Sequence, residues 1–292
     1  MKQVFLVILL AFGFVVGAQN KIVKKPKKQK PATTQVAPKK HKSQSKPTKG
    51  GTVKRVATKA SYSNGTLTVN GIKYNMVWVD GGTFRMGATS EQGSDANDRE
   101  RPVHSVTLSG YYIGKTEVTQ ALWKAVMGSN PSEFKGDNRP VESVSWDDCQ
   151  AFIRKLNALT GQNFRLPTEA EWEFACRGGN NSRGYKYSGS NYIDNVAWHD
   201  GNFGDKTHPV ATKSPNELGI YDMSGNVWEW CADWYGDYSS GRQTNPKGPY
   251  DGSDRVRRGG SWGFYAGCCR SSDRDYCPPT YRFYYLGLRL AL

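Results

Sequence analysis

The segment Arg165-Leu-Pro-Thr-Glu-Ala-Glu-Trp-Glu-Phe-Ala-Cys-Arg-Gly-Gly179 carries the strongest local structural signal in this chain. In Thr168-Glu-Ala-Glu171, the threonine hydroxyl and the glutamate carboxylate can each bond a backbone amide that the first turn of a helix leaves without a partner. Gly178 and Gly179 then favour helix termination, because glycine accepts the left-handed backbone conformation. We therefore predict a short helix that starts after Thr168 and ends near Gly178.

The surrounding sequence predicts two further helices and several short strands. One helix runs from about Thr119 to Met127 and ends at Gly128, and another starts near Asp147 and ends at Gly161. The alternating segment 67–74 contains Asn70-Gly71, which suits a two-residue hairpin turn, and a further strand is expected through 76–79, leading into Gly81-Gly82 and the segment 84–87. After Arg177 the chain reads as turns and short strands. The predicted fold class is α+β: a single domain with about three helices, short strands and much irregular coil.

The first 18 residues have the three parts of a secretory signal peptide. Lys2 gives a basic start, an apolar run extends from Val4 to Val16, and the small residues Gly17 and Ala18 follow. The run is shorter than the ~20 residues of a bilayer-spanning helix, so we expect cleavage, with an uncleaved anchor as the alternative. The mature protein is then exported to the periplasm, the cell envelope or the medium, with no transmembrane segment after cleavage.

Residues 19–60 form a basic segment that accounts for the net charge of +14. They contain thirteen Lys, one Arg and no Asp or Glu, which leaves 25 basic and 26 acidic residues in 61–292. The segment has few large apolar side chains, so we expect a disordered spacer. It is either a solubilising spacer or an electrostatic tether to an anionic envelope polymer. The near-neutral remainder of the chain gives no reason to expect specific nucleic-acid binding.

Five segments together resemble the ordered landmarks of one protein family. They are Val79-Asp-Gly-Gly-Thr-Phe-Arg-Met-Gly87, Thr116-Glu-Val-Thr-Gln120, the 165–179 segment, Asn216-Glu-Leu-Gly-Ile-Tyr-Asp-Met-Ser-Gly-Asn-Val-Trp-Glu-Trp-Cys231, and Arg255-Val-Arg-Arg-Gly-Gly-Ser-Trp262, closing with Leu286-Gly-Leu-Arg289. Their order resembles the formylglycine-generating enzyme, or sulfatase-modifying factor, family over roughly residues 75–292. The resemblance implies a single domain at 61–292 related to the C-type lectin fold. It also implies bound calcium and, in the founding enzymes, copper-dependent oxidation of a sulfatase cysteine to formylglycine.

The resemblance places one calcium loop in the segment 222–229. Asp222 and Glu229 would bind through their carboxylates, and Gly225 and Val227 through backbone carbonyls, giving the oxygen ligands that calcium prefers. The alternative is a capped turn whose carboxylates bond local amides.

A second family calcium loop would use Asn195 and the carbonyl of Val196. The segment that follows, 198–205, is shorter than in the founding enzymes, with Asn202 or Asp205 as possible substitutes. The expected cofactor is therefore calcium, better supported at the first loop than at the second.

The resemblance fails at the copper site. Active members carry two cysteines five positions apart after Gly-Gly-Ser, and their thiolates bind Cu(I). In this chain Phe264 takes the first position and Cys269 the second, and a phenyl ring cannot bind copper. Catalysis would then depend on Cys268 with Cys269, assisted by Ser261, although adjacent side chains diverge in an extended chain. Cu(I) is accordingly a doubtful cofactor.

The remaining cysteines leave another interpretation of Cys269 open. Export permits disulfides, and six cysteines allow fifteen complete pairings. The alternative to catalysis is a structural disulfide from Cys269, for example to Cys231 or Cys176.

Other polar side chains predict little additional chemistry. We expect local hydrogen-bonding roles for His104, His199 and His208, and the helix dipole explains the three glutamates of the 165–179 segment. Trp228 and Trp230 are expected in the core. The tyrosines at 265, 276, 281, 284 and 285 could pack or line a recognition surface.

Three functions follow from these observations. The first is an atypical, non-oxidising member of the family that binds an extracytoplasmic protein or glycan. The second is a formylglycine-generating oxidase that matures exported sulfatases through Cys268 and Cys269. The third is an envelope protein that is tethered by its cationic spacer.

Overall fold

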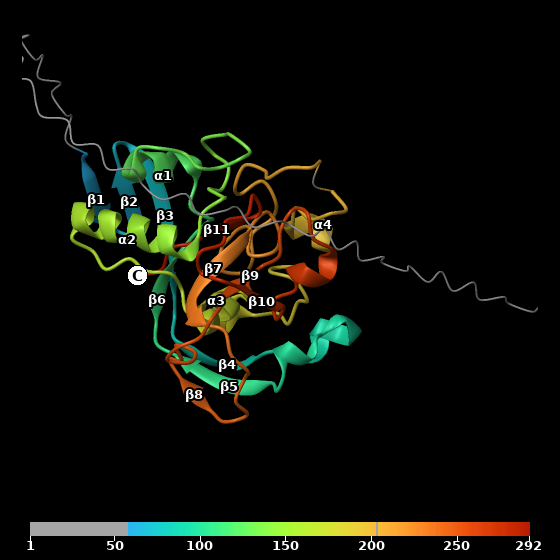
Figure 1. Ribbon diagram of the computed structural model, residues 1–292. Helices are drawn as coiled ribbons and strands as arrows, with labels where there is room; N and C mark the ends of the chain where they lie inside the picture. The colour runs from blue at the N-terminus through green and yellow to red at the C-terminus, as the bar shows by residue number, and fades with distance from the viewer. Residues whose placement is uncertain (1–57, 203) are drawn as a thin grey trace, which may run out of the picture. The chain divides into compact units, whose positions relative to one another are not determined.

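The computed structural model describes residues 58–202 and 204–292. The signal peptide predicted for residues 1–18 lies outside the described residues, as does the predicted spacer up to residue 57. The described chain belongs to one compact unit, Arg55–Leu292, and Figure 1 shows its elements.

The first sheet has the strand order β1-β2-β3-β6 and is antiparallel throughout. Its strands are β1 (Ala60–Ser63), β2 (Thr66–Val69), β3 (Ile72–Val79) and β6 (Tyr111–Gly114). The predicted hairpin is confirmed, because Val69 pairs with Ile72 across Asn70 and Gly71. Both turn residues have positive φ angles, 49° and 84°, as this two-residue turn requires.

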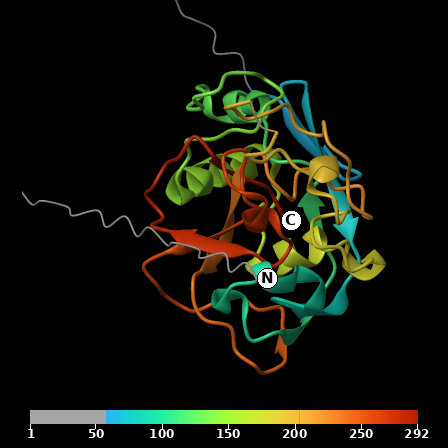
Figure 2. The same cartoon turned by 90° about the vertical axis from the view of Figure 1, so that its right-hand side faces the viewer.

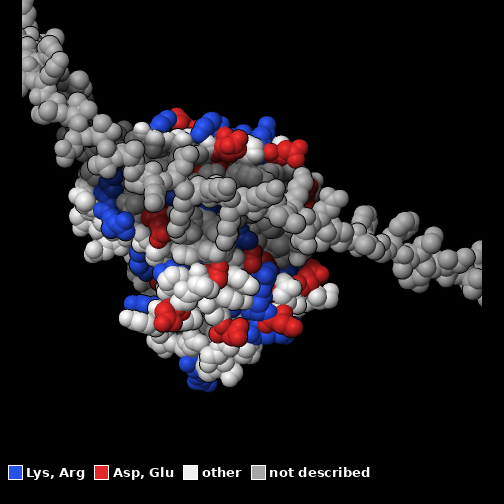
Figure 3. Space-filling view, viewed as in Figure 1, with Lys and Arg blue, Asp and Glu red and all other residues white. Residues whose placement is uncertain are grey.

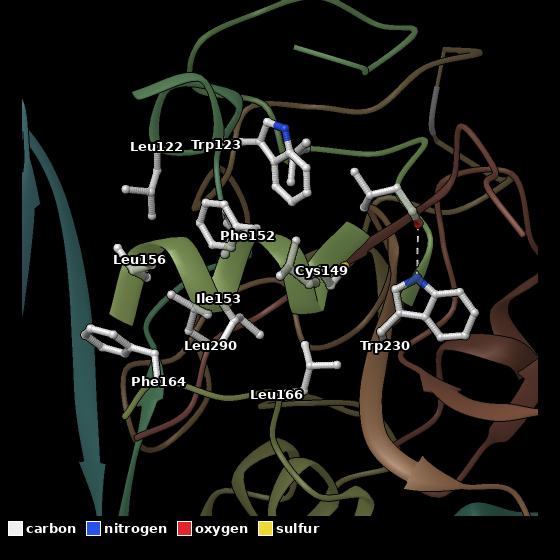
Figure 4. Packing of buried hydrophobic residues seen from close by; sticks show 14 of the residues in the cluster. Leu122, Trp123, Cys149, Phe152, Ile153, Leu156, Phe164, Leu166, Trp230 and Leu290 are labelled. Carbon is white, nitrogen blue, oxygen red and sulfur yellow. Dashed lines mark hydrogen bonds between the residues drawn. The ribbon is translucent and has the colours of Figure 1, made fainter. Parts of the chain in front are cut away.

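Two helices pack against the first sheet and enclose its core. Helix α1 (Gln120–Met127) is capped by Thr119, and α2 (Trp146–Thr160) begins with a capping box between Ser145 and Asp148. Gly128 and Gly161 end these helices in the left-handed conformation, with φ angles of 86° and 69°. Figure 4 shows the buried side chains between the helices, where Trp123 and Phe152 stack with ring centroids 4.8 Å apart.

The second sheet lies next to the third predicted helix. Its order is β10-β9-β7-β11, and it consists of β7 (Trp228–Trp234), β9 (Arg255–Arg258), β10 (Arg274–Cys277) and β11 (Leu286–Leu288). Strand β11 runs parallel to β7, whereas the other pairs are antiparallel. Trp228 and Trp230 are 1% and 0% exposed, which confirms their predicted place in the core.

Helix α3 (Glu169–Cys176) has the predicted capping box. Thr168 Oγ1 accepts a hydrogen bond from the Glu171 amide at 3.2 Å, and the Glu171 carboxylate accepts one from the Thr168 amide at 2.8 Å. Seven of its eight residues are buried, so α3 is a central helix whose start is fixed by its own sequence.

The third sheet is small and pairs distant parts of the chain. It contains β4 (Gly82–Met86), β5 (His104–Leu108) and β8 (Gln243–Thr244), with β8 parallel to β5. The short α4 (Ile193–Val196) and four 3₁₀ turns, which the sequence did not predict, complete the fold; the turns are Ser90–Asp95, Asp98–Glu100, Gly179–Asn181 and Ala266–Cys269.

The chain end is integrated into the domain. Leu292 and Tyr112 exchange two backbone hydrogen bonds of 3.0 and 3.1 Å, so the C-terminus lies beside β6 (Figures 1 and 2). The α+β class and the three predicted helices are confirmed. Within the described ranges, no helix is long and apolar enough to cross a membrane.

Candidate functional site

The loop that precedes β7 has backbone geometry that only particular residues can adopt. Asp222 has a φ angle of 59° and Gly225 one of 81°. A Cβ atom on Gly225 would lie 2.2 Å from the Trp198 carbonyl oxygen, so a side chain at this position is excluded. The loop is thereby held against the segment that contains the second predicted calcium position.

Three carboxylates are buried beside this loop. Glu117 and Glu229 are fully buried, and Asp222 is nearly so. Glu117 accepts hydrogen bonds from the Val227 amide at 3.1 Å and from Asn226 Nδ2 at 2.8 Å. Asp222 Oδ2 accepts a hydrogen bond from the Ala211 amide at 2.7 Å.

Arg289 provides the guanidinium that faces these carboxylates. It donates to both oxygens of Glu229, with Nη2 to Oε1 at 2.7 Å and Nε to Oε2 at 3.0 Å. The Trp172 indole also donates to Glu229, at 2.7 Å. The oxygens of Glu229 are therefore engaged by protein donors, and its role as a calcium ligand stays a prediction.

The charges of this cluster do not cancel. Burial, followed by repulsion from Asp222, raises the pKa of Glu117 well above its usual value. Burial also raises the pKa of Asp222 to about 6, although the Ala211 amide opposes this. Three carboxylates with one guanidinium carry a formal surplus of negative charge, which a cation would relieve. Asp222 is the carboxylate of this loop that is not paired with an arginine, whereas Glu229 is paired with Arg289.

Calcium at this loop remains a prediction. The described ranges contain no group of three or more His, Cys, Asp or Glu side chains arranged to hold a metal. Sequence reasoning missed Glu117 and Arg289 as members of the cluster, although both stand in segments that carry the family resemblance.

The second predicted calcium position is a different kind of loop. Asn195 is exposed, and its carbonyl accepts a hydrogen bond from the Ser214 amide at 2.9 Å. Val196 is buried at the end of α4. Asn202 bonds within its own loop, donating to Asp194 at 2.8 Å and accepting from the His199 amide at 3.0 Å. Asp205 is exposed, so no assembled cation site is evident here.

The histidines have the local roles that were predicted for them. The ring nitrogens of His199 lie 3.0 Å from Asp194 and 3.1 Å from Asp200. His104 Nδ1 lies 3.0 Å from the Pro102 carbonyl oxygen, and His208 stacks on Trp198 with ring centroids 3.7 Å apart.

The residues predicted for oxidation lie together in the chain but not in one reactive group. Cys269 is fully buried and packs with Tyr187 and Val196, whereas Cys268 joins the larger core cluster that Phe264 also contacts. Cys269 Sγ lies against the backbone of Gly260, since a Cβ there would approach the sulfur to 2.7 Å. The two adjacent thiols therefore belong to separate side-chain clusters.

Burial keeps both thiols in the protonated form. It raises the pKa of Cys268 to about 11 and that of Cys269 well above its usual value. Ser261 is also fully buried, and its Oγ has no hydrogen-bond partner among the described residues. A copper ion would have to reach two buried sulfurs and displace their protons.

Phe264 occupies the position of the first copper cysteine as part of an aromatic cluster. Its ring contacts Trp228 and Tyr285 edge to face, with centroids 5.7 and 5.2 Å apart. Tyr285 stacks on Phe283 at 4.9 Å. Phe264 is thus a packing residue in a well-filled environment.

The predicted disulfide of Cys269 is wrong. All six cysteines are buried free thiols, and Cys269 contacts neither predicted partner within its cluster. In this fold the cysteines act as small apolar core side chains.

Several tyrosines near the C-terminus expose their rings. Tyr265, Tyr276, Tyr281 and Tyr284 are 43% to 60% exposed. Tyr284 contacts the ring of Trp262 at 5.7 Å, and Tyr281 contacts Phe283 at 5.8 Å. Tyr281 and Tyr284 are thus exposed rings that are each supported by another aromatic ring.

Comparison with known proteins identifies the family to which this fold belongs. A family model described as the sulfatase-modifying factor enzyme 1-like domain matches residues 66–292. The chain belongs to this family. The formylglycine-generating enzyme of Mus musculus is 31% identical over 286 residues, covering 74% of each chain.

Two further members of the comparison show the range of this sulfatase-modifying-factor-like fold. The chaperone protein LppX of Paenibacillus barcinonensis is 38% identical over 253 residues, which is 70% of this chain and 82% of that protein. The solved structure of Treponema denticola variable protein 1 is 37% identical with a TM-score of 0.69, covering 77% of this chain and 97% of that one. Relatives with different names thus share the fold, and function has to be argued from the site.

Proposed function

We propose that this protein is an exported, non-oxidising member of the sulfatase-modifying factor family, which binds an extracytoplasmic protein or glycan. The observation that carries the proposal is Phe264. A phenyl ring packed between Trp228 and Tyr285 stands where an active member needs a thiolate. The remaining thiol, Cys269, is fully buried in a side-chain cluster separate from that of Cys268, so a two-thiolate copper site at these cysteines requires a rearrangement.

Copper binding and thiol oxidation test the loss of activity. The full chain would be titrated with Cu(I) in competition with a chelating dye, then incubated with oxygen and a Cys-x-Pro-x-Arg peptide. We expect no tight one-to-one copper binding and no formylglycine in the peptide by mass spectrometry. The Cys269→Ser variant should behave like the native chain.

The opposite result would support the oxidase. Tight one-to-one binding that is lost in Cys269→Ser, together with peptide conversion, would show that Cys269 works despite Phe264. The oxidase is the alternative to test, because this chain is similar to a formylglycine-generating enzyme.

The exposed tyrosines support the binding part of the proposal. Aromatic side chains supply large contact area at little cost in side-chain entropy, and Tyr281 and Tyr284 are supported from below by Phe283 and Trp262. We expect Tyr281→Ala with Tyr284→Ala to weaken ligand binding by about 1 to 4 kcal/mol, as measured on glycan and peptide arrays. Tyr250→Ala is the matched control, because Tyr250 is 99% exposed. Equal binding by the native chain and the double variant would contradict this assignment.

Calcium at the 222–229 loop is part of the same proposal. The buried carboxylates of Glu117 and Asp222 support it, because burial raises the pKa of both and a bound cation would stabilise their ionised forms. We expect calcium to raise the melting temperature of the native chain, and Asp222→Asn to remove that shift. An equal shift in both proteins would place the ion elsewhere.

A further inference from the structure

A cavity of about 480 Å³ opens between the start of α3, β7 and the segment 236–249, near β8 in Figure 1. This volume suits a small organic ligand. Its lining includes three buried charged side chains, Glu169, Asp233 and Arg274. The cavity shares no residue with the aromatic cluster around Phe264 or with the 222–229 loop.

Two of the buried charges satisfy each other. Arg274 donates to Glu169 from Nε at 2.7 Å and from Nη2 at 2.6 Å. The remaining nitrogen, Nη1, donates to the carbonyls of Gly236 at 2.9 Å and Arg99 at 3.2 Å. The Tyr238 hydroxyl lies 3.3 Å from Glu169 Oε1. The charged groups of Arg274 and Glu169 are therefore already paired by hydrogen bonds within the protein.

Asp233 is the buried charged residue of this cavity that can still accept a hydrogen bond. It is 4% exposed, and its Oδ2 accepts a hydrogen bond from the Glu169 amide at 2.9 Å. Its Oδ1 accepts no hydrogen bond from a protein donor within the described ranges. This oxygen lies against Gly248 on the cavity lining, where a Cβ would be 3.1 Å away.

When both carboxylates are ionised, Glu169 faces Arg274 at 2.6 Å and Arg258 at 3.6 Å, and Asp233 faces Arg255. Burial and then the charge of Glu169 raise the pKa of Asp233 to about 8, with a smaller contribution from Glu171. Arg274 opposes the shift, and Arg255 also faces Asp233. Among the other lining residues, Asp237 and Lys247 are exposed and of opposite sign, so water screens their fields. His104 is a buried titratable residue of the same lining.

We propose that this cavity binds a primary ammonium group, which donates a hydrogen bond to Asp233 Oδ1. The alkyl part of such a ligand would contact Pro246, Pro249 and Tyr238, which line the same space. The ligand class is therefore a small alkylamine or the side chain of a lysine. This site is independent of the proposed function, because it involves neither Cys269 nor the exposed tyrosines.

The geometry favours ammonium over other cations. A guanidinium binds best to two coplanar carboxylate oxygens, but the Glu169 amide already occupies Asp233 Oδ2. Calcium requires six to eight oxygen ligands, and Glu169 is engaged by Arg274. An ammonium group needs one strong acceptor and can donate its other protons to Ser239, Gln243 or water.

The test is titration of the full chain with n-butylammonium chloride by calorimetry between about pH 6 and 9, at constant ionic strength. Protons compete for Asp233, so the association constant should rise up to about tenfold per pH unit below pH 8 and level off above it. Asp233→Asn should weaken binding by about tenfold or more at pH 8.5. Asp237→Asn is the matched control, because it removes an exposed carboxylate from the same cavity, and should change affinity less than about twofold.

Several results would overturn the proposal. These are no binding by the native chain, unchanged affinity in Asp233→Asn, equal losses in both variants, or affinity that does not vary with pH. Tighter binding of methylguanidinium than of butylammonium would overturn the ligand class. If Asp233→Asn does not give a native near-ultraviolet circular dichroism spectrum, the pH profile of the native chain decides alone.

Discussion

Four buried arginines carry charges whose removal from water has to be offset by ion pairs. Arg258, Arg270, Arg274 and Arg289 are at most 1% exposed, and each forms an ion pair with a buried glutamate. Removing water from a charged group costs several kcal/mol, which its partners have to offset. Each arginine is therefore needed as much for the carboxylate it neutralises as for its own packing.

Arg289→Met should destabilise the protein by about 3 to 5 kcal/mol, because it leaves Glu229 buried without its countercharge. Urea unfolding at neutral pH would measure the loss. Arg282→Met is the control: Arg282 pairs with Asp148 at an exposed site, and its loss should cost less than about 1 kcal/mol. Similar costs for both variants would refute the assigned role of Arg289.

Asp233 should make stability fall with rising pH. Its pKa is about 8 in the folded protein and its usual value is 3.8, so between these values the folded state holds a proton that the unfolded state has released. This one group then lowers stability by up to about 1.4 kcal/mol per pH unit across that window. Asp233→Asn should remove that slope and be more stable than the native chain at pH 8.5, as judged by chemical unfolding. The prediction would be refuted if the stability of the native chain rose between pH 5 and 8 and the stability of the variant rose in parallel.

At the scale of the element, the helices are defined by their ends. Helices α1, α2 and α3 each begin at a Thr or Ser whose side chain accepts a backbone amide hydrogen bond. Helices α1 and α2 end at glycines in the left-handed conformation. Each of these signals stands next to the helix end that it marks, which is why sequence alone located all three helices.

Thr168→Ala should destabilise the protein by about 1 kcal/mol, since the Glu171 amide loses its acceptor at the start of α3. Thr168→Ser keeps the hydroxyl and should recover most of the loss. Thermal unfolding of both variants measures the difference. If the serine variant is no more stable than the alanine variant, the cap does not determine the stability of α3.

At the scale of the whole molecule, charge is distributed unevenly along the chain. Residues 19–60 carry a charge of +14, which equals the net charge of the whole chain. Elsewhere, Lys2 and the 25 basic residues of 61–292 balance the 26 acidic residues. On the face seen in Figure 3, basic and acidic side chains are interspersed. We therefore propose that any general attraction to anionic polymers comes from residues 19–60.

Deleting residues 19–60 should weaken retention on heparin by at least roughly tenfold at low ionic strength, because thirteen lysines and one arginine are lost. Retention of the full chain should fall steeply as salt is added, whereas the deleted form should show little salt dependence. Elution across a salt gradient measures both. Unchanged retention after the deletion would refute the tether.

The sequence alone determined the family, the α+β class, the hairpin at Asn70-Gly71 and the three main helices. Capping residues, turn glycines and the order of the family-like segments are local signals, so they can be read without knowing which residues meet in space. The replacement of the first copper cysteine by Phe264 was visible in the same way.

The tertiary structure decided which side chains meet. Arg289 reaches Glu229 across 60 positions, and Arg274 reaches Glu169 across 105; no local pattern encodes either pair. The engagement of Glu229 by Arg289, the separate environments of Cys268 and Cys269, and the open oxygen of Asp233 all depend on such long-range packing. Burial sets the protonation of these groups, and burial is a property of the folded chain.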